Sequence, residues 1–236
     1  MNLIMIFDYK EMNWVLIFLS IIGLAFLFFA SFLLSKTKLC SWRKRKLDHI
    51  SFLLYIGILR AFNTNFYDIL AIFLISVLIV GILSIIPSIK LFDFFISKDH
   101  RIDEPKKELG VNIILTALML IYVFFITLDS PFAFVGGIFV LSLGDGMGEL
   151  VGRSFGKSKV IRNYPKTLEG SFAVFLGSLT ALTITYYMYK ISIIENFLII
   201  FVLAIFATVL EFICKNLFDN LCIPLSISVM IYFLNQ

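Results

Sequence analysis

The chain has 236 residues, of which 60% are hydrophobic and only 15% are charged, and its mean hydropathy is +0.99. This composition is far too apolar for a soluble globular domain and predicts an integral membrane protein. The formal net charge of +4 says little by itself, because in a membrane protein the arrangement of charges along the chain matters more than their sum.

Long apolar runs predict an all-α bundle of about seven or eight membrane helices, formed by residues 1–236 as one domain. The runs are continuous rather than alternating, which favours helices over a membrane barrel. The first run ends in SKTKLCSWRKRK without a small-residue cleavage site, so we expect a retained helix. The predicted helices are residues 14–35, 49–61, 69–89, 110–128, 131–151, 169–189, 196–214 and 223–235. The second and the eighth have about 13 residues, which is short for a full crossing.

Basic residues gather on alternate connections between these helices. The loops at 36–48, 90–109, 152–168 and 215–222 hold 17 of the 20 Lys and Arg residues. The positive-inside rule therefore places these four loops in the cytoplasm and both termini outside. We expect a multi-pass protein of a prokaryotic cytoplasmic membrane, with its functional site at the cytoplasmic face.

The second predicted helix begins in a polar stretch, SWRKRKLDHISF. Arg45, Lys46 and His49 lie there within about one helical turn. A lone histidine at a helix end is more often a capping or packing residue than a catalytic one. Its neighbours nevertheless make it a candidate member of a polar site.

The stretch LSLGDGMGELVGRSFGK, residues 141–157, places charges in an apolar helix. Asp145, Glu149 and Arg153 recur every fourth residue and line one helical face. A local pair of Glu149 with Arg153 would leave Asp145 without a partner. Because two carboxylates one turn apart repel, the spacing favours a divalent metal or an equivalent cation between them.

Glycines form a second stripe on the same helix. Gly144, Gly148 and Gly152 share the four-residue spacing that lets another helix approach closely. This packing explanation does not exclude a function for the same face.

The segment RSFGKSKVIRNYPKTLEGS, residues 153–171, holds five cations. It is either an anchor on anionic lipid or a phosphate site, since glycine turns, helix N-termini and basic side chains all bind phosphate. Its position directly after the two acids predicts a nucleotide site. It is no P-loop, because GRSFGKS has one residue too few between its glycines, and the GxGxG at 144–148 follows no βαβ strand.

Two acidic positions follow near the C-terminus. Glu211 lies inside an apolar helix, where a charge is costly. Asp219 and Asn220 precede Pro224, a pattern typical of a turn or cap.

Together these segments resemble a family of membrane lipid kinases that includes dolichol kinase, phytol kinase and the yeast CTP-dependent diacylglycerol kinase. Members are often labelled phosphatidate cytidylyltransferase-like. The resemblance rests on RKLDH (45–49), GDGMGELVGRSFGK (144–157), PKTLEGS (165–171), and Glu211 followed by DNLCIPL (219–225). Gly148 stands where the family commonly has alanine.

The resemblance implies transfer of the terminal phosphate of CTP to a lipid alcohol, such as phytol, a polyprenol, dolichol or diacylglycerol. Asp145, Glu149 and Asp219 are the expected Mg²⁺ ligands, and Glu211 or Asp219 is expected to accept the alcohol proton. These four acids are the candidate catalytic residues. The candidate nucleotide and phosphate ligands are Arg45, Lys46, His49, Gly144, Gly146, Arg153, Gly156, Lys157, Lys166, Thr167, Glu169, Gly170 and Asn220.

Three alternatives stay open. A phosphatidate cytidylyltransferase would use similar groups but release pyrophosphate. An ion-coupled transporter would use the buried acids to carry protons or cations. A structural membrane protein would use the glycines and basic loops only for packing and orientation. The expected partners are CTP, a lipid alcohol and the bilayer, with no nucleic acid; a homo-oligomer is compatible with the sequence.

Overall fold

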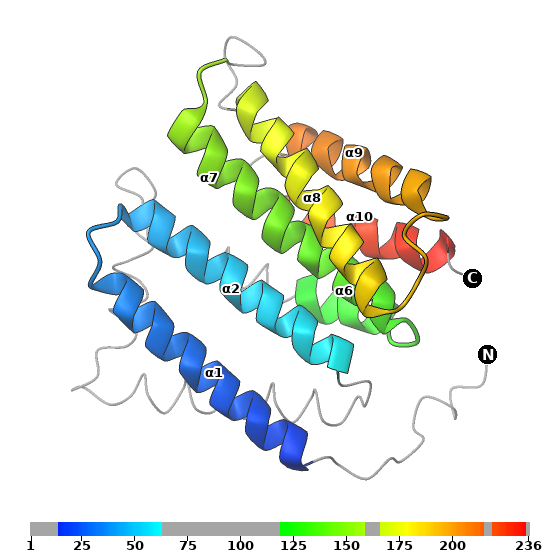
Figure 1. Cartoon of the computed structure of the whole chain (residues 1–236), viewed down its shortest axis with the longest axis horizontal. Helices are drawn as coiled ribbons and strands as arrows, with labels where there is room; N and C mark the ends of the chain where they lie inside the picture. The colour runs from blue at the N-terminus through cyan, green and yellow to red at the C-terminus, as the bar shows by residue number, and fades with distance from the viewer. Residues whose placement is uncertain (1–13, 63–118, 159–165, 215–218, 235–236) are drawn as a thin grey trace.

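The computed structural model describes residues 14–62, 119–158, 166–214 and 219–234 (Figure 1). These residues form helices and their connections, with no strand among them, so the predicted all-α class is confirmed for the described part. The predicted helix at 69–89, the basic loop at 90–109 and residues 110–118 lie outside it. Residues 119–126 are helical, in agreement with the prediction for 110–128.

The first two helices are α1, Trp14–Ser35, and α2, Ser41–Phe62, each of 22 residues. The predicted start of the second helix at residue 49 was wrong, because α2 begins eight residues earlier. Arginine and lysine are good helix formers, so the basic run from Arg43 to Lys46 continues the helix out of its apolar part. The side chains of residues 42–48, which were predicted to lie in a loop, therefore project from a helix.

Residues 131–155 form one helix in three parts: α6, Pro131–Phe139; the π-helical η2, Val140–Asp145; and α7, Gly146–Phe155. The helix begins where Ser130 Oγ accepts a hydrogen bond from the Ala133 N–H (3.3 Å), with proline at the first helical position. It extends the predicted helix at 131–151 by one turn. π-Helical segments are rare and occur often at functional sites.

Three further helices complete the described chain. α8, Leu168–Met188, and α9, Phe197–Ile213, agree closely with the predictions. α10, Asp219–Leu234, begins four residues before the predicted start and has Pro224 in its interior. Of the two possibilities that the sequence left open for Asp219 and Asn220, a turn or a helix cap, the start of α10 at Asp219 favours the helix start. Asp and Asn are favoured at helix starts, and proline is tolerated in membrane helices, so these signals mark the beginning of the helix.

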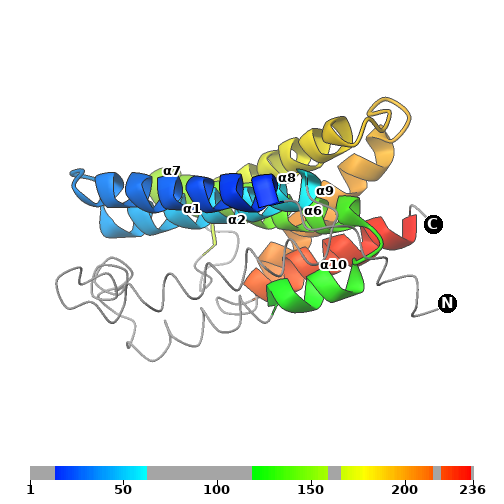
Figure 2. The ribbon, with the colours of Figure 1, turned by 90° about the horizontal axis from the view of Figure 1, so that it is seen from below.

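Figure 1 shows the helix of residues 131–155 between α2 and α8, with α1 outside α2 and α9 outside α8. In Figure 2, α10 lies to one side of the layer that contains α1, α2, α7 and α8. The core forms where the central helix, α8, α9 and α10 meet. Its fully buried side chains include Ile138, Leu141, Leu182, Leu203 and Ile227.

Within the described part of the chain, three helices are long and apolar enough to cross a membrane: Trp14–Leu34, Pro131–Phe155 and Leu168–Met188. The central one is 61% buried inside the protein, whereas the first is only 17% buried. Large side chains on α1, including Trp14, Phe18 and Phe26, are exposed. Such an apolar outer surface fits contact with lipid rather than with water.

The predicted glycine packing face is confirmed between α7 and α8. A Cβ atom placed on Gly148 would lie 2.3 Å from Val174 Cγ2, and one on Gly144 would lie 2.5 Å from Ser178 Oγ. A Cβ atom on Gly152 would lie 3.3 Å from the Gly170 Cα, and one on Gly170 would lie 3.1 Å from the Gly152 Cα. Glycine at these positions allows the two helices to approach, as small residues do in membrane bundles.

Candidate functional site

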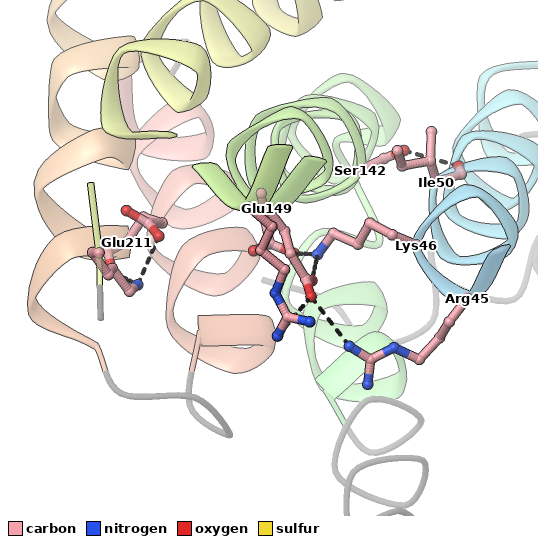
Figure 3. A network of polar contacts seen from close by, with 9 residues as sticks. Arg45, Lys46, Ile50, Ser142, Glu149 and Glu211 are labelled. Atoms are coloured by element: carbon pink, nitrogen blue, oxygen red, sulfur yellow. Dashed lines mark hydrogen bonds and ion pairs between the residues drawn. The ribbon is translucent and has the colours of Figure 1, made fainter. Parts of the chain in front are cut away.

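A network of charged side chains joins α2 to the junction of η2 and α7 (Figure 3). Lys46 Nζ forms ion pairs with Asp145 Oδ2 and with Glu149 Oε2, the latter at 3.1 Å. The Lys46 side chain is only 7% exposed. The expectation that Asp145 would lack a protein partner was wrong, because this ammonium group lies between the two carboxylates.

Two arginines complete the network around Glu149. Arg45 and Arg153 each place a guanidinium nitrogen 3.2 Å from Glu149 Oε1. The local pair of Glu149 with Arg153, which the sequence left open as the alternative to a bound cation, is therefore present together with the Lys46 contacts. The Arg153 side chain is 40% exposed and that of Arg45 is 19% exposed, so the arginines form the solvent side of the network.

His49 lies on the same helix, one turn after Arg45 and Lys46. It is within Coulombic range of Lys46, Asp145 and Glu149. Its Nε2 atom is buried and has no hydrogen-bond partner among the described residues. A buried polar atom of this kind is uncommon and leaves one hydrogen bond of the ring open.

Nearby, Lys166 joins the start of α8 to the end of α9. Its Nζ lies 2.7 Å from Glu211 Oε1 and also donates to the main-chain carbonyls of Glu211 and Cys214. A cation at the C-terminus of a helix binds these carbonyls and complements the helix dipole. The second carboxylate oxygen of Glu211, Oε2, is buried and has no hydrogen-bond partner among the described residues.

The two groups of charges belong to one end of the bundle. Asp145 is within Coulombic range of both Lys166 and Glu211. Figure 3 shows Arg45 and Lys46 approaching Glu149 from α2, with Glu211 on the other side of α7. Two of the basic segments that the sequence placed on one side of the membrane, residues 36–48 and 152–168, thus meet in their described parts: Arg45 and Arg153 both contact Glu149.

Two predicted phosphate ligands at the start of α8, Thr167 and Glu169, make hydrogen bonds within the protein. Thr167 caps the helix, since its Oγ1 accepts the Gly170 N–H (3.2 Å). Glu169 accepts the Ser158 N–H at 3.2 Å and fixes the connection after α7. Lys157 is exposed on this connection and therefore accessible to a solute.

The predicted glycine ligands lie mostly in helix contacts. A Cβ on Gly146 would lie 2.5 Å from Ile50 Cγ1 of α2, and one on Gly156 would lie 2.2 Å from the Gly152 carbonyl. Gly144 and Gly170 face α8 and α7, respectively. Close packing thus accounts for these four glycines in the described structure.

Sequence reasoning missed Trp42. The guanidinium groups of Arg43 and Arg153 lie over its ring, 5.2 and 5.5 Å from the ring centre. Arg43 also donates to Ser154 Oγ (3.1 Å), so this aromatic contact holds α2 against α7. A tryptophan directly before a basic run was the available signal, since arginine commonly stacks on tryptophan.

The carboxylates of Asp145 and Glu149 have the chemistry that Mg²⁺ requires. Mg²⁺ is commonly bound by one or two carboxylates, with water and substrate phosphates as the other ligands. Within the described part of the chain no group of three His, Cys, Asp or Glu residues forms a metal site of its own. Asp219 begins α10 and Asn220 lies in its first turn; the side chain of Asp219 is outside the described atoms.

Comparisons with protein-family models, with curated proteins and with solved structures found no match to this chain. The lipid-kinase resemblance is therefore carried by the sequence motifs alone.

Proposed function

We propose that this protein is a membrane lipid-alcohol kinase that transfers the terminal phosphate of CTP to the hydroxyl of an isoprenoid alcohol or diacylglycerol. The observation that carries the proposal is the buried network of Lys46, Asp145 and Glu149, with Arg45 and Arg153 on its solvent side. Buried ionic groups in membrane bundles are expensive and commonly mark functional sites. A network with outward arginines suits a ligand that carries several negative charges.

The location suits two substrates of opposite polarity. The network lies toward the end of the helix of residues 131–155. The first part of this helix, Phe132–Phe139, is buried, and its last residue, Phe155, is exposed. A nucleotide would reach Arg153 and Lys157 from water, while the tail of a lipid alcohol would stay beside the apolar helices. The alcohol hydroxyl would then meet the terminal phosphate without the tail leaving the bilayer.

Phosphoryl transfer depends mainly on positioning and on neutralising charge. Arg45, Arg153 and Lys157 would bind phosphate oxygens, and Asp145 and Glu149 would hold Mg²⁺. When bound, this ion would neutralise charge on the transferred phosphate. The alcohol oxygen forms a new bond to the γ-phosphorus, the bond from that phosphorus to the β–γ bridging oxygen breaks, and CDP leaves.

A base is needed to accept the alcohol proton. Glu211 Oε2 is a candidate, because it is buried and has no hydrogen-bond partner in the described structure. Lys166, paired with Oε1, would hold the carboxylate in place. Asp219 is the alternative base that the sequence also predicts.

The test uses purified protein in detergent micelles with Mg²⁺ and a panel of lipid alcohols, in parallel reactions with γ-labelled CTP, α-labelled CTP and γ-labelled ATP. Label in the lipid from γ-labelled CTP alone would support the kinase, and the labelled alcohol would identify the acceptor. Lipid labelled from α-labelled CTP, with phosphatidate present, would instead establish cytidylyl transfer. No labelled lipid from folded protein in any reaction would contradict both enzymes and favour a transporter or a structural protein.

A further inference from the structure

Lys46 occupies the place that the sequence assigned to a divalent metal or an equivalent cation. Its ammonium group contacts one oxygen of Asp145 and one oxygen of Glu149, and its side chain is 7% exposed. The two carboxylates are themselves only 13% and 16% exposed. The acid pair thus has a cation of its own, supplied by a neighbouring helix.

Among the ion pairs of the described residues, the positive charges of this network outnumber the negative ones. Arg45, Lys46 and Arg153 contribute three positive charges, against two negative charges from Asp145 and Glu149. A divalent ion at the carboxylates would face repulsion from three cations within the same group of contacts. In a partly buried site such repulsion is only weakly screened by salt.

We propose that Lys46 acts as an internal counter-ion that excludes divalent metal from the Asp145–Glu149 pair until a nucleotide arrives. The inference rests on the proposed function, since it concerns the order in which that site fills. The negative phosphates of a nucleotide reverse the local charge balance. The ammonium group, on its flexible four-carbon stem, then turns from the carboxylates to a phosphate and leaves them to the metal.

A purely structural ion pair would have a different consequence. In that case the close packing of α2 against α7 would keep metal from the carboxylates, and removing Lys46 would destabilise this contact without creating an affinity for metal. The two explanations are separated by metal binding measured in the absence of nucleotide.

The experiment measures Mn²⁺ binding by electron paramagnetic resonance on the full-length protein in detergent without nucleotide. Wild type and the control Lys44→Met should bind Mn²⁺ equally weakly. Lys44 suits as control because it lies on the same helix but donates to the Thr37 carbonyl (2.7 Å). Lys46→Met should bind at least about tenfold tighter, because one competing unit charge beside the carboxylates is gone. Adding Glu149→Gln to Lys46→Met should abolish the gain.

Because Lys46→Met removes a buried partner, Lys46→Gln is prepared in parallel; it keeps a hydrogen-bond donor but lacks the charge. Unchanged Mn²⁺ affinity in either folded variant would overturn the inference, and so would tight Mn²⁺ binding by wild type without nucleotide. The result for the wild type does not depend on whether any variant folds. Since no nucleotide or lipid is present, a protein without kinase activity leaves this result unaffected. Labelled lipid with unchanged Mn²⁺ affinity would keep the function and reject the role of Lys46.

Discussion

The two ends of α2 each bury a cation, and they do so with different partners. At one end Lys46 lies between the carboxylates of Asp145 and Glu149. At the other, Arg60 is 3% exposed, donates to the Leu128 carbonyl at 2.7 Å and lies 5.0 Å from the centre of the Phe124 ring. Both side chains hold a second segment of the chain against α2.

The different partners of these two cations indicate which end of α2 is structural and which is functional. The Leu128 carbonyl and the Phe124 ring carry no net charge, so these Arg60 contacts tie the segment at 119–128 to α2 without placing a carboxylate inside the bundle. Two acids near an apolar helix are costly, and a structural tie between helices does not require them. The Lys46 end is therefore the functional one in our account.

The largest expected effect on stability is that of Lys46→Met. It leaves two partly buried carboxylates with one cation fewer, and breaking a buried ion pair costs about 3–5 kcal/mol. The free energy of unfolding, measured in mixed detergent micelles, gives the effect. The control Lys44→Met should change it by only about 1 kcal/mol, because Lys44 is half-buried and its hydrogen bond to the Thr37 carbonyl is exposed. Equal values for the two variants would mean that the Lys46 pairs contribute nothing net.

Arg60→Met should have a smaller effect. The charge and the donor disappear together, so the loss includes the hydrogen bond to the Leu128 carbonyl and the contact with the Phe124 ring, and an acceptor left unsatisfied costs about 1–3 kcal/mol. Phosphate transfer per folded molecule should stay at the wild-type rate. A tenfold or greater loss of transfer in folded protein would show that the Arg60 end of α2 also serves the reaction, which would contradict the distinction between the two ends.

Arg153→Ala should have the smallest effect on stability, because its side chain is 40% exposed and exposed ion pairs contribute about 0–1 kcal/mol. Its expected effect is instead a higher KM for the nucleotide, because it would bind phosphate. Unfolding and steady-state kinetics on the same preparation give both values. A large loss of stability with an unchanged KM would assign Arg153 to packing, together with Trp42.

Much of the fold follows from the sequence, because apolar runs of membrane length determine where helices lie. The spacing of Gly148 and its neighbours likewise predicted the contact between α7 and α8. The start of α2 was missed because apolar periodicity ends where the helix leaves the apolar region, and the helix itself continues through Arg43–Lys46. A run of residues with high helix propensity does not itself indicate where the helix begins.

The candidate site was predicted in part. The i, i+4 spacing identified the face that carries Asp145 and Glu149, and it predicted a cation between them. That this cation is Lys46 depends on how α2 lies against α7, across 99 positions of sequence. One sequence contains no information on that register, so nothing distinguished Lys46 from Arg45 as the partner of the two acids, and Trp42 gave no sign of its contact with Arg153, until the helices were placed.

The central claim is that the carboxylates at the Lys46 end perform phosphoryl transfer, and a matched pair of variants tests it most directly. Asp145→Asn and Asp129→Asn make the same chemical change, the first within the network and the second at an exposed position near the Arg60 end. The account predicts that transfer from γ-labelled CTP falls by about 100-fold or more in folded Asp145→Asn, as when a charge-stabilising group is removed from an active site, and is unchanged in Asp129→Asn. Equal transfer by both variants would contradict the account.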